Sequence, residues 1–334
     1  MRRTLPLLLT ATLLFAACGS GGDDASDNST NDTTDTENSV DVPSDTTDTE
    51  TSDAETSDAE TSDGGTVPPQ PAIAEVEVPE VEIPDEIPTE LVVTVLEEGT
   101  GRPAEAGDQV FIDYVGVRTE DGVGFDNSYE PRQPGTAPAP FDFVLGQQQV
   151  ITGWDEGLVG AQTGARIQLD IPSDLAYGPA GSGDIIRANE ALTFLLEVRA
   201  VIKPTDPTEA PTEPGVPPSE GAVETTSTDL VEGEGDELQA GQTGIINYVL
   251  FRGDNGVALE SSWEAAPVPV PTADGGFPGF VKGLPGMKVG GRRAIVITPA
   301  DAFGPEGNPQ LGLPAGTDMI IVVELLGFFG QPTT

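Results

Sequence analysis

Alternating apolar and polar positions mark several short strands between residues 91 and 203. The runs VFIDYVGV, FDFVLG, RIQLDI and LTFLLEVRAVI are rich in branched and aromatic residues, and in several of them alternate residues are apolar. One short stretch at 153–161, GWDEGLVGA, carries its apolar residues at helical offsets instead. The pattern predicts an α+β domain in which one short helix lies across the concave face of a sheet.

A second copy of this pattern follows further along the chain. INYVLFRGDNGVALESSWE parallels IDYVGVRTEDGVGFDNSYE, GFVKGLPGMKVGGRRAIVITPADAFG parallels GWDEGLVGAQTGARIQLDIPSDLAYG, and MIIVVELLGF parallels LTFLLEVRAV. We therefore expect two related domains, at 91–203 and 223–330. Between them, the Pro-, Thr- and Glu-rich stretch KPTDPTEAPTEPGVPPSE predicts a linker over 204–222.

The N-terminal part of the chain has the composition of a disordered segment. No Lys or Arg occurs between Arg3 and Arg102, and residues 19–90 are filled with Asp, Glu, Ser and Thr. Such a segment cannot bury enough apolar area to offset its chain entropy, so we expect a disordered acidic linker. Residues 71–90 alternate apolar and acidic positions and could add an edge strand, but their prolines favour an extended linker.

The acidic balance of the chain narrows the set of partners. The formal net charge is −43, and much of it lies in the N-terminal segment. An acidic chain repels nucleic acid, so no nucleic-acid partner is expected. Because no DxDxDG loop is present, the acidic tract is interpreted as a solvated spacer rather than a calcium site.

The first 18 residues have the layout of a secretory signal. Two arginines precede an apolar stretch from Leu5 to Ala17 that is too short to span a bilayer. Cys18, the only cysteine, ends the sequence LFAAC, which resembles the lipobox of bacterial lipoproteins. The resemblance implies cleavage of a signal peptide before Cys18 and an extracytoplasmic protein that is lipid-anchored to the cell membrane. A plain signal peptide and a buried thiol are the alternatives.

The absence of histidine excludes several kinds of chemistry. It removes Ser-His-Asp and Cys-His hydrolysis, His-containing zinc sites and acid–base catalysis by histidine. No GxxxxGK[ST] motif occurs, and the glycines at 99–101 indicate a turn rather than a phosphate site. We therefore expect neither a metal nor a cofactor.

Aromatic and branched residues recur in the first domain at spacings that suggest a pocket, with one carboxylate among them. The set is Tyr114, Phe125, Asp126, Phe141, Val150, Ile151, Trp154, Tyr177, Ile185, Ile186 and Phe194. Any one of these is more often a plain core residue. Their order and spacing together resemble the FK506-binding-protein (FKBP) family of peptidyl-prolyl cis-trans isomerases over residues 91–203. The resemblance implies a bent antiparallel sheet wrapped around one helix.

The resemblance also implies a reaction and its partners. Rotation about an X-Pro bond must cross a barrier of about 18–20 kcal/mol, and lowering it requires no nucleophile, metal or proton shuttle. A site that holds the proline ring, removes water and stabilises the twisted amide is sufficient. The implied partners are proline-containing unfolded or exported polypeptides, with FK506-type macrolides as inhibitors. A non-catalytic chaperone or binding module and a surface scaffold lipoprotein are the alternatives.

The family's roles carry over residue by residue. Trp154 would form the floor under the proline ring, and the walls would be Tyr114, Phe125, Phe141, Val150, Ile151 and Phe194. Ile185 and Ile186 would lie on a loop over the rim. The Ile151 N–H and the Tyr177 hydroxyl would donate to substrate carbonyls. Asp126 would be the polar group nearest the twisting amide, or it would be structural and bind Tyr114 or an arginine such as Arg132.

The second domain departs from this pattern. Tyr248 is retained, but the counterparts of Phe125, Asp126, Trp154 and Tyr177 are Leu259, Glu260, Phe280 and Phe303. PVPVPTADGG replaces PFDFVLG, so we expect that strand and the counterpart of Phe141 to be missing. These changes predict a weak or inactive isomerase.

Overall fold

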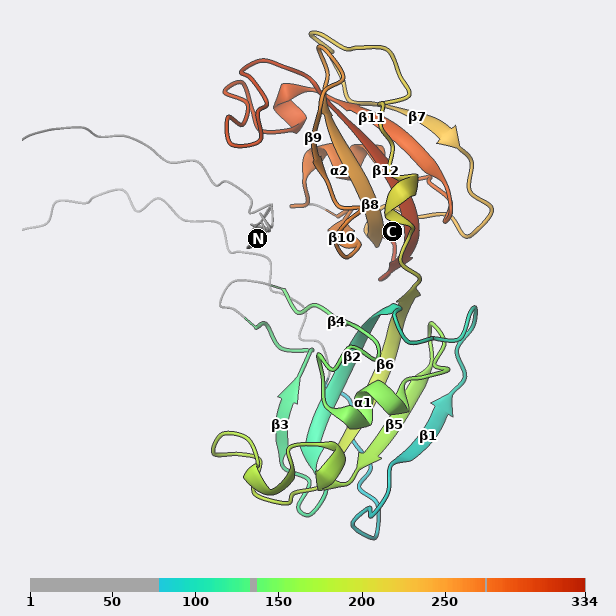
Figure 1. Ribbon diagram of the computed structural model, residues 1–334, viewed down its shortest axis with the longest axis vertical. Helices are drawn as coiled ribbons and strands as arrows, with labels where there is room; N and C mark the ends of the chain where they lie inside the picture. The colour runs from blue at the N-terminus through green and yellow to red at the C-terminus, as the bar shows by residue number, and fades with distance from the viewer. Residues whose placement is uncertain (1–77, 133–136, 274, 334) are drawn as a thin grey trace, which may run out of the picture. The chain divides into compact units, whose positions relative to one another are not determined.

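The computed structural model describes residues 78–132, 137–273 and 275–333. Within these ranges the chain forms two six-stranded antiparallel sheets, each with one short α-helix (Figure 1). The predicted α+β architecture with an internal repeat is therefore confirmed. The proposed signal, Cys18 and most of the acidic segment lie outside the described residues.

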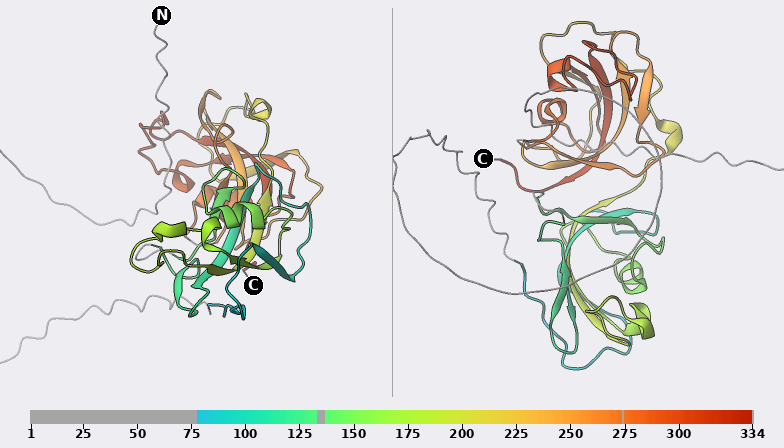
Figure 2. Two further views of the ribbon diagram at one scale, coloured as in Figure 1. Left: turned by 60° about the horizontal axis from the view of Figure 1, so that its bottom comes forward. Right: turned by 90° about the vertical axis from the view of Figure 1, so that its left-hand side faces the viewer.

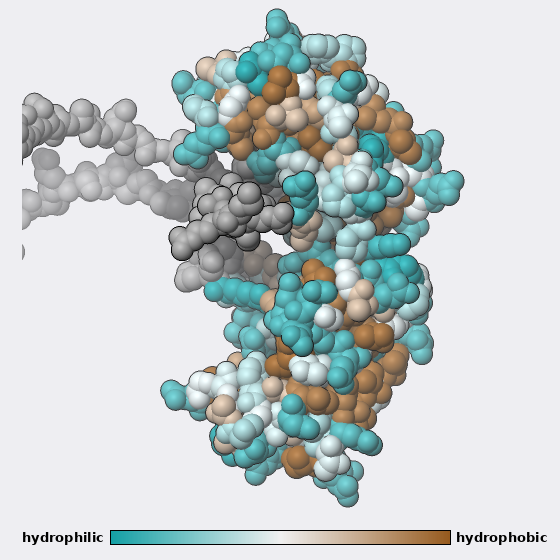
Figure 3. Space-filling model, in the orientation of Figure 1, coloured by the Kyte–Doolittle hydropathy of each residue, from teal (hydrophilic) through white to brown (hydrophobic). Residues whose placement is uncertain are grey.

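The first sheet has the strand order β1-β5-β6-β2-β3, with β4 paired to β2. Its elements are β1 Val92–Glu97, β2 Gln109–Arg118, β3 Gly124–Asn127, β4 Phe141–Val144, α1 Thr152–Gly157, β5 Arg166–Ile171, η1 Ser173–Leu175, η2 Gly178–Ala180 and β6 Leu192–Ile202. The long strands β2 and β6 pair at the centre, where their residues are almost all buried. Strand β1 forms one edge, and all six of its residues are exposed although four are Val or Leu. Figure 3 shows apolar surface on this side of the first domain.

Helix α1 lies against one face of the curved sheet (Figure 2). Two glycines one turn apart make this close contact possible. A Cβ atom on Gly153 would lie 2.5 Å from the Ile171 side chain, and one on Gly157 would lie 2.8 Å from Leu169. In the second domain, Gly279 and Gly283 approach β11 just as closely. Both helices therefore need glycine where they face the sheet.

The second sheet repeats the arrangement in the order β10-β8-β12-β11-β7, with β9 paired to β8. Its elements are β7 Thr226–Val231, β8 Thr243–Arg252, β9 Ala258–Ser261, β10 Val268–Pro271, α2 Pro278–Gly283, β11 Arg292–Ile297, η4 Pro299–Asp301 and β12 Met319–Phe329. Each domain has its own apolar core between helix and sheet.

Strand β10 corrects an expectation from the sequence. Its residues VPVP pair with β8 with Val268 opposite Ile246, much as Phe141 of β4 lies opposite Ile112 of β2. The strand is therefore present, and its expected loss was wrong. The two prolines of β10 are two residues apart, so both can face away from β8 at a sheet edge, where no N–H donor is required.

The segment 204–222, which the sequence predicts as a linker, packs on the outer face of the second sheet. It contains the short helix η3 Pro207–Glu209, and Ala210 packs against a cluster that includes Trp263. The fully buried carboxylate of Asp318 accepts hydrogen bonds from the Ser219 hydroxyl at 2.7 Å and the Ala222 N–H at 2.8 Å. These contacts hold the end of the segment on the second domain.

Candidate active site

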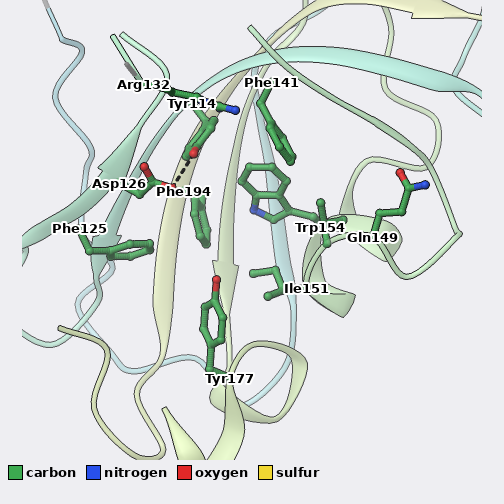
Figure 4. A pocket seen from close by; sticks show the side chains of 11 residues that line it. Tyr114, Phe125, Asp126, Arg132, Phe141, Gln149, Ile151, Trp154, Tyr177 and Phe194 are labelled. Carbon is green, nitrogen blue, oxygen red and sulfur yellow. Dashed lines mark hydrogen bonds between the residues drawn. The ribbon is translucent and has the colours of Figure 1, made fainter. Parts of the chain in front are cut away.

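A pocket of about 410 Å³ opens on the helix-bearing face of the first sheet (Figure 4). Its lining consists of Tyr114, Phe125, Asp126, Arg132, Phe141, Gln149, Val150, Ile151, Trp154, Tyr177 and Phe194. The structure thus brings together nine of the eleven residues that the sequence suggested. They come from β2, β3, β4, β6, the start of α1 and the turn before η2.

Trp154 forms the floor of this pocket. It is 4% exposed, and its ring centroid lies 5.1 Å from those of Tyr114 and Phe194 in edge-to-face arrangements. Phe141 adds a further ring at 6.1 Å. The indole Nε1 is buried and has no hydrogen-bond partner among the described residues. The floor therefore offers an aromatic surface with one unpaired N–H group.

A glycine in β2 makes room for the opposite wall. A Cβ atom on Gly116 would lie 2.7 Å from the Phe194 ring and 2.8 Å from the Phe125 ring. Those two rings meet at 90° with centroids 5.5 Å apart. In the pairing of the strands, Gly116 lies opposite Asp126 and Phe194. Leu250 takes the place of this glycine in the second domain, where it lies opposite Glu260 and Ile321.

Tyr114 and Asp126 form the main polar contact within the pocket. The Tyr114 hydroxyl donates a hydrogen bond of 2.6 Å to Asp126 Oδ2. Burial raises the pKa of Tyr114 well above its usual value, and the bond to Asp126 raises it further, so the phenol remains a donor at neutral pH. Of the two structural partners left open for Asp126, the structure shows Tyr114. The Arg132 guanidinium instead lies 4.9 Å from the centre of the Phe141 ring.

The two predicted donors occupy the other side of the pocket. Tyr177 is 40% exposed, and its hydroxyl points toward the pocket in Figure 4. Partial burial, and then the charge of Asp126, raise the pKa of Tyr177. The Ile151 carbonyl accepts the N–H groups of Trp154 and Asp155 as α1 begins, which fixes the backbone of Ile151 beside the floor.

Ile185 and Ile186 do not line the pocket. Ile186 is 7% exposed and belongs to the apolar core, whereas Ile185 is 50% exposed on the surface of its loop. Conversely, Gln149 and Arg132 line the pocket, although Gln149 was not among the predicted residues and Arg132 was predicted only as a partner for Asp126. Gln149 directly precedes Val150 and Ile151, so its position in the chain was the available signal.

The second domain carries other side chains at several of the corresponding positions. Tyr248 keeps its bond to the carboxylate that replaces Asp126, with 2.7 Å to Glu260 Oε1. Phe277 stands where the first domain has Ile151, and its ring lies 5.3 Å from Phe280 and 5.8 Å from Phe303. Phe277 and Phe303 are both packed against the apolar core. The substitution at Phe277 was not among those predicted from the sequence.

The fold and the first pocket together define a class of protein. A bent sheet around one helix, with an aromatic floor and a tyrosine–carboxylate pair at the wall, is suited to enclose an apolar ring and an adjacent amide. This is the arrangement expected from the resemblance to the peptidyl-prolyl isomerases.

Comparison with known proteins identifies the family. Residues 100–199 and 235–326 match the family described as FKBP-type peptidyl-prolyl cis-trans isomerase. An FK506-binding protein of Streptomyces anulatus is 42% identical over 117 residues, which cover 35% of this chain and 90% of that protein. Peptidyl-prolyl cis-trans isomerase FKBP10 of Mus musculus is 32% identical over 239 residues, which cover 71% of this chain and 37% of that protein.

A crystal structure of a peptidyl-prolyl cis-trans isomerase from Pseudomonas syringae pv. tomato is 37% identical in sequence. The alignment covers 38% of this chain and 84% of the chain in that crystal structure, with a TM-score of 0.29. Since the family match extends over both repeats, the chain belongs to the FKBP-type peptidyl-prolyl cis-trans isomerases.

Proposed function

We propose that the first domain carries the isomerase activity and that it acts by enclosing proline and stabilising the twisted amide. The observation that supports this most directly is the pocket of about 410 Å³ with Trp154 as its floor and the Tyr114–Asp126 pair at its wall. A proline ring on the indole brings the preceding amide near the carboxylate. Removal of water there strengthens every polar contact with the amide.

The roles proposed for the polar groups follow from how the amide changes as it twists. The planar amide loses its resonance, so its carbonyl carbon no longer receives electron density from nitrogen. The Asp126 carboxylate would stabilise that carbon, while the Tyr177 hydroxyl and the Ile151 N–H would donate to substrate carbonyls. These groups are held in place before substrate arrives, which makes their stabilisation of the transition state effective.

The test is an NMR-exchange or protease-coupled isomerisation assay of a short X-Pro peptide with the full chain. We expect acceleration over the uncatalysed peptide and inhibition by a macrolide of the FK506 type. Exchange at the uncatalysed rate would refute the proposal. Low turnover with retained macrolide binding would instead favour the binding-module alternative, in which the same pocket holds proline segments without accelerating them.

For the second domain we propose a binding or structural role with little or no isomerase activity. Phe277 and Phe303 support this, since they occupy the space that Ile151 and Tyr177 leave open in the first domain, and Phe303 lacks the donor hydroxyl. A double variant, Phe277→Ile with Phe303→Tyr, should increase macrolide binding by this domain. Unchanged binding would show that something other than these two rings closes the site.

We further propose that the protein acts on exported polypeptides outside the cytoplasmic membrane, anchored through a lipid on Cys18. The secretory layout of residues 1–18 and the lipobox-like LFAAC support this. In the described part of the chain, no helix has the length and apolar character needed to cross a membrane. Metabolic labelling with a radioactive fatty acid tests the proposal, and a chain without label would contradict it.

A further inference from the structure

Two loops of the first domain frame the open side of the pocket. The rim loop, residues 178–191, follows Tyr177 and leads into β6, which carries Phe194. The β2–β3 turn, residues 119–123, leads directly into Phe125 and Asp126. A link between these two loops therefore connects the wall that bears the Tyr177 hydroxyl with the wall that bears the carboxylate.

Arg118, at the end of β2, provides the first half of such a link. Its Nε and Nη2 donate to Asp121 Oδ1 and Oδ2 at 3.0 and 2.6 Å, which is a two-point contact within the turn. Its Nη1 donates to the carbonyl oxygen of Ile185 in the rim loop at 3.1 Å. One guanidinium thus binds both loops at the same time.

Arg187 of the rim loop provides the second half. Its Nη2 lies 3.0 Å from Asp121 Oδ2 in the turn and 2.9 Å from Glu190 Oε1 in its own loop. The side chain of Glu190 is 3% exposed, and its Oε2 also accepts the Arg187 backbone N–H at 2.6 Å. A carboxylate buried to this degree must be paired, so Glu190 keeps Arg187 directed at the turn. We call Arg118, Asp121, Arg187 and Glu190 the rim network.

The second domain supplies an internal comparison. Its Arg252, at the end of β8 as Arg118 is at the end of β2, makes the same two-point contact with Asp254 of its own turn, at 3.0 and 2.6 Å. Its longer loop carries Pro314 directly after the buried Leu313, where the first domain has Arg187 after Ile186. Among the residues that the structure describes, no ion pair joins that loop to the β8–β9 turn. The fold itself therefore does not require the rim network.

We propose that the rim network positions the first active site by fixing the Tyr177 wall relative to the Phe125–Asp126 wall. The inference rests on the proposed isomerase activity of this pocket. The network holds walls whose rings and donors contact the substrate in every state, together with the Asp126 carboxylate that acts on the twisted amide. Its loss therefore weakens substrate binding and raises KM, and it also lowers kcat to a smaller extent. Arg187 and Asp121 are 50% and 38% exposed in their side chains, so added salt weakens the network too.

The experiment compares Arg118→Gln with Arg252→Gln in the full chain, using an uncharged X-Pro peptide. Arg118→Gln should raise KM by about three- to fivefold, the effect of one or two partly exposed ion pairs, with kcat within about twofold of the wild type. Arg252→Gln should leave both constants unchanged, and Arg118→Lys should restore part of the loss because it keeps the charge. Between about 0.05 and 1 M salt, KM of the wild type should rise by a larger factor than that of Arg118→Gln, which keeps only the network's Arg187 pairs with Asp121 and Glu190.

Two readouts separate this proposal from a structural role and from the proposed function. A variant that is merely less stable would lose kcat through its folded fraction and would exchange amide hydrogens faster throughout the domain. The proposal instead expects faster exchange confined to the rim loop, at the Ser182 and Ile186 amides that bond to each other's carbonyls. If the wild type proves inactive, the proposed function fails, and unchanged exchange at these amides in Arg118→Gln would overturn the rim network. In an active wild type, an unchanged KM would overturn it.

Discussion

The bond between Tyr114 and Asp126 allows the charge of the carboxylate to be tested separately from its orientation. Asp126→Asn keeps an oxygen that can accept the hydrogen bond from the Tyr114 hydroxyl but removes the negative charge. Tyr114→Phe removes the donor and keeps the charge. If the carboxylate stabilises the twisted amide electrostatically, the first change should reduce catalysis more than the second.

The structure sets the expected sizes of these effects. Asp126 is an exposed residue, so water replaces the donor lost in Tyr114→Phe, and we expect the free energy of unfolding to fall by about 1 kcal/mol. With substrate bound, a full charge about 5 Å from roughly half a charge at an effective dielectric of about 20 contributes about 1.5 kcal/mol. Asp126→Asn should therefore lower kcat/KM about tenfold, and Tyr114→Phe about two- to threefold.

The assay is isomerisation of an X-Pro peptide by the full chain, with Glu260→Gln and Tyr248→Phe as the matched controls in the second domain. Both controls should leave kcat/KM unchanged, because they alter the equivalent tyrosine–carboxylate bond in the second domain, for which we propose little or no isomerase activity. A wild-type kcat/KM for Asp126→Asn would refute the electrostatic role. Asp126 would then serve only to hold Tyr114.

Four further measurements follow from the same structure. Trp154→Ala should leave a void beneath the proline ring, lowering the unfolding free energy of the first domain by about 3–5 kcal/mol and reducing kcat/KM at temperatures where the domain stays folded; undiminished kcat/KM would place the site elsewhere. Measured separately, residues 91–203 should be far more active than residues 204–330, which keep the segment packed on the second sheet, and comparable kcat/KM values would refute the proposed division of roles. Cys18→Ser should release the protein to the soluble fraction or leave its signal uncleaved, and unchanged membrane association of a processed variant would contradict the anchor. All four tyrosines have a raised pKa, chiefly through burial. In an absorbance titration, the tyrosines of the folded chain should therefore ionise above the usual pKa of about 10, and those of the unfolded chain should ionise at about 10. Since the folded-state pKa is the higher one, these groups contribute stability that is complete below about pH 10 and is lost as the pH rises through the folded-state values. Titration of the folded chain at about 10 would contradict this.

One strand, one loop and one side chain differ from what the sequence predicted. The absence of β10 was expected because PVPVPTADGG replaces PFDFVLG, yet the strand forms and keeps the register of β4. Its prolines are tolerated because an edge strand needs an N–H only from alternate residues. Ile185 and Ile186 were predicted on the loop over the pocket, and they lie on the rim loop, but Ile186 is buried in the core and Ile185 is exposed, so neither lines the pocket. An irregular loop has no fixed side-chain period from which the sequence could have shown this. Phe277 went unnoticed because its effect depends on its contact with Phe303, which lies 26 residues further along the chain.

The sequence by itself determined the repeat, the α+β class, the family resemblance and nine of the pocket residues, because period-two alternation and the order of aromatic residues are local properties of the chain. Only the tertiary structure decided which partner Tyr114 binds, that Gly116 makes room for two rings, and that Phe277 and Phe303 lie against each other in the second domain. It alone brought Arg118 and Arg187 to the same carboxylate from positions 69 residues apart. Such contacts form between segments far apart in the chain that come together only when β2 pairs with β6, so the spacing of residues within one strand cannot predict them.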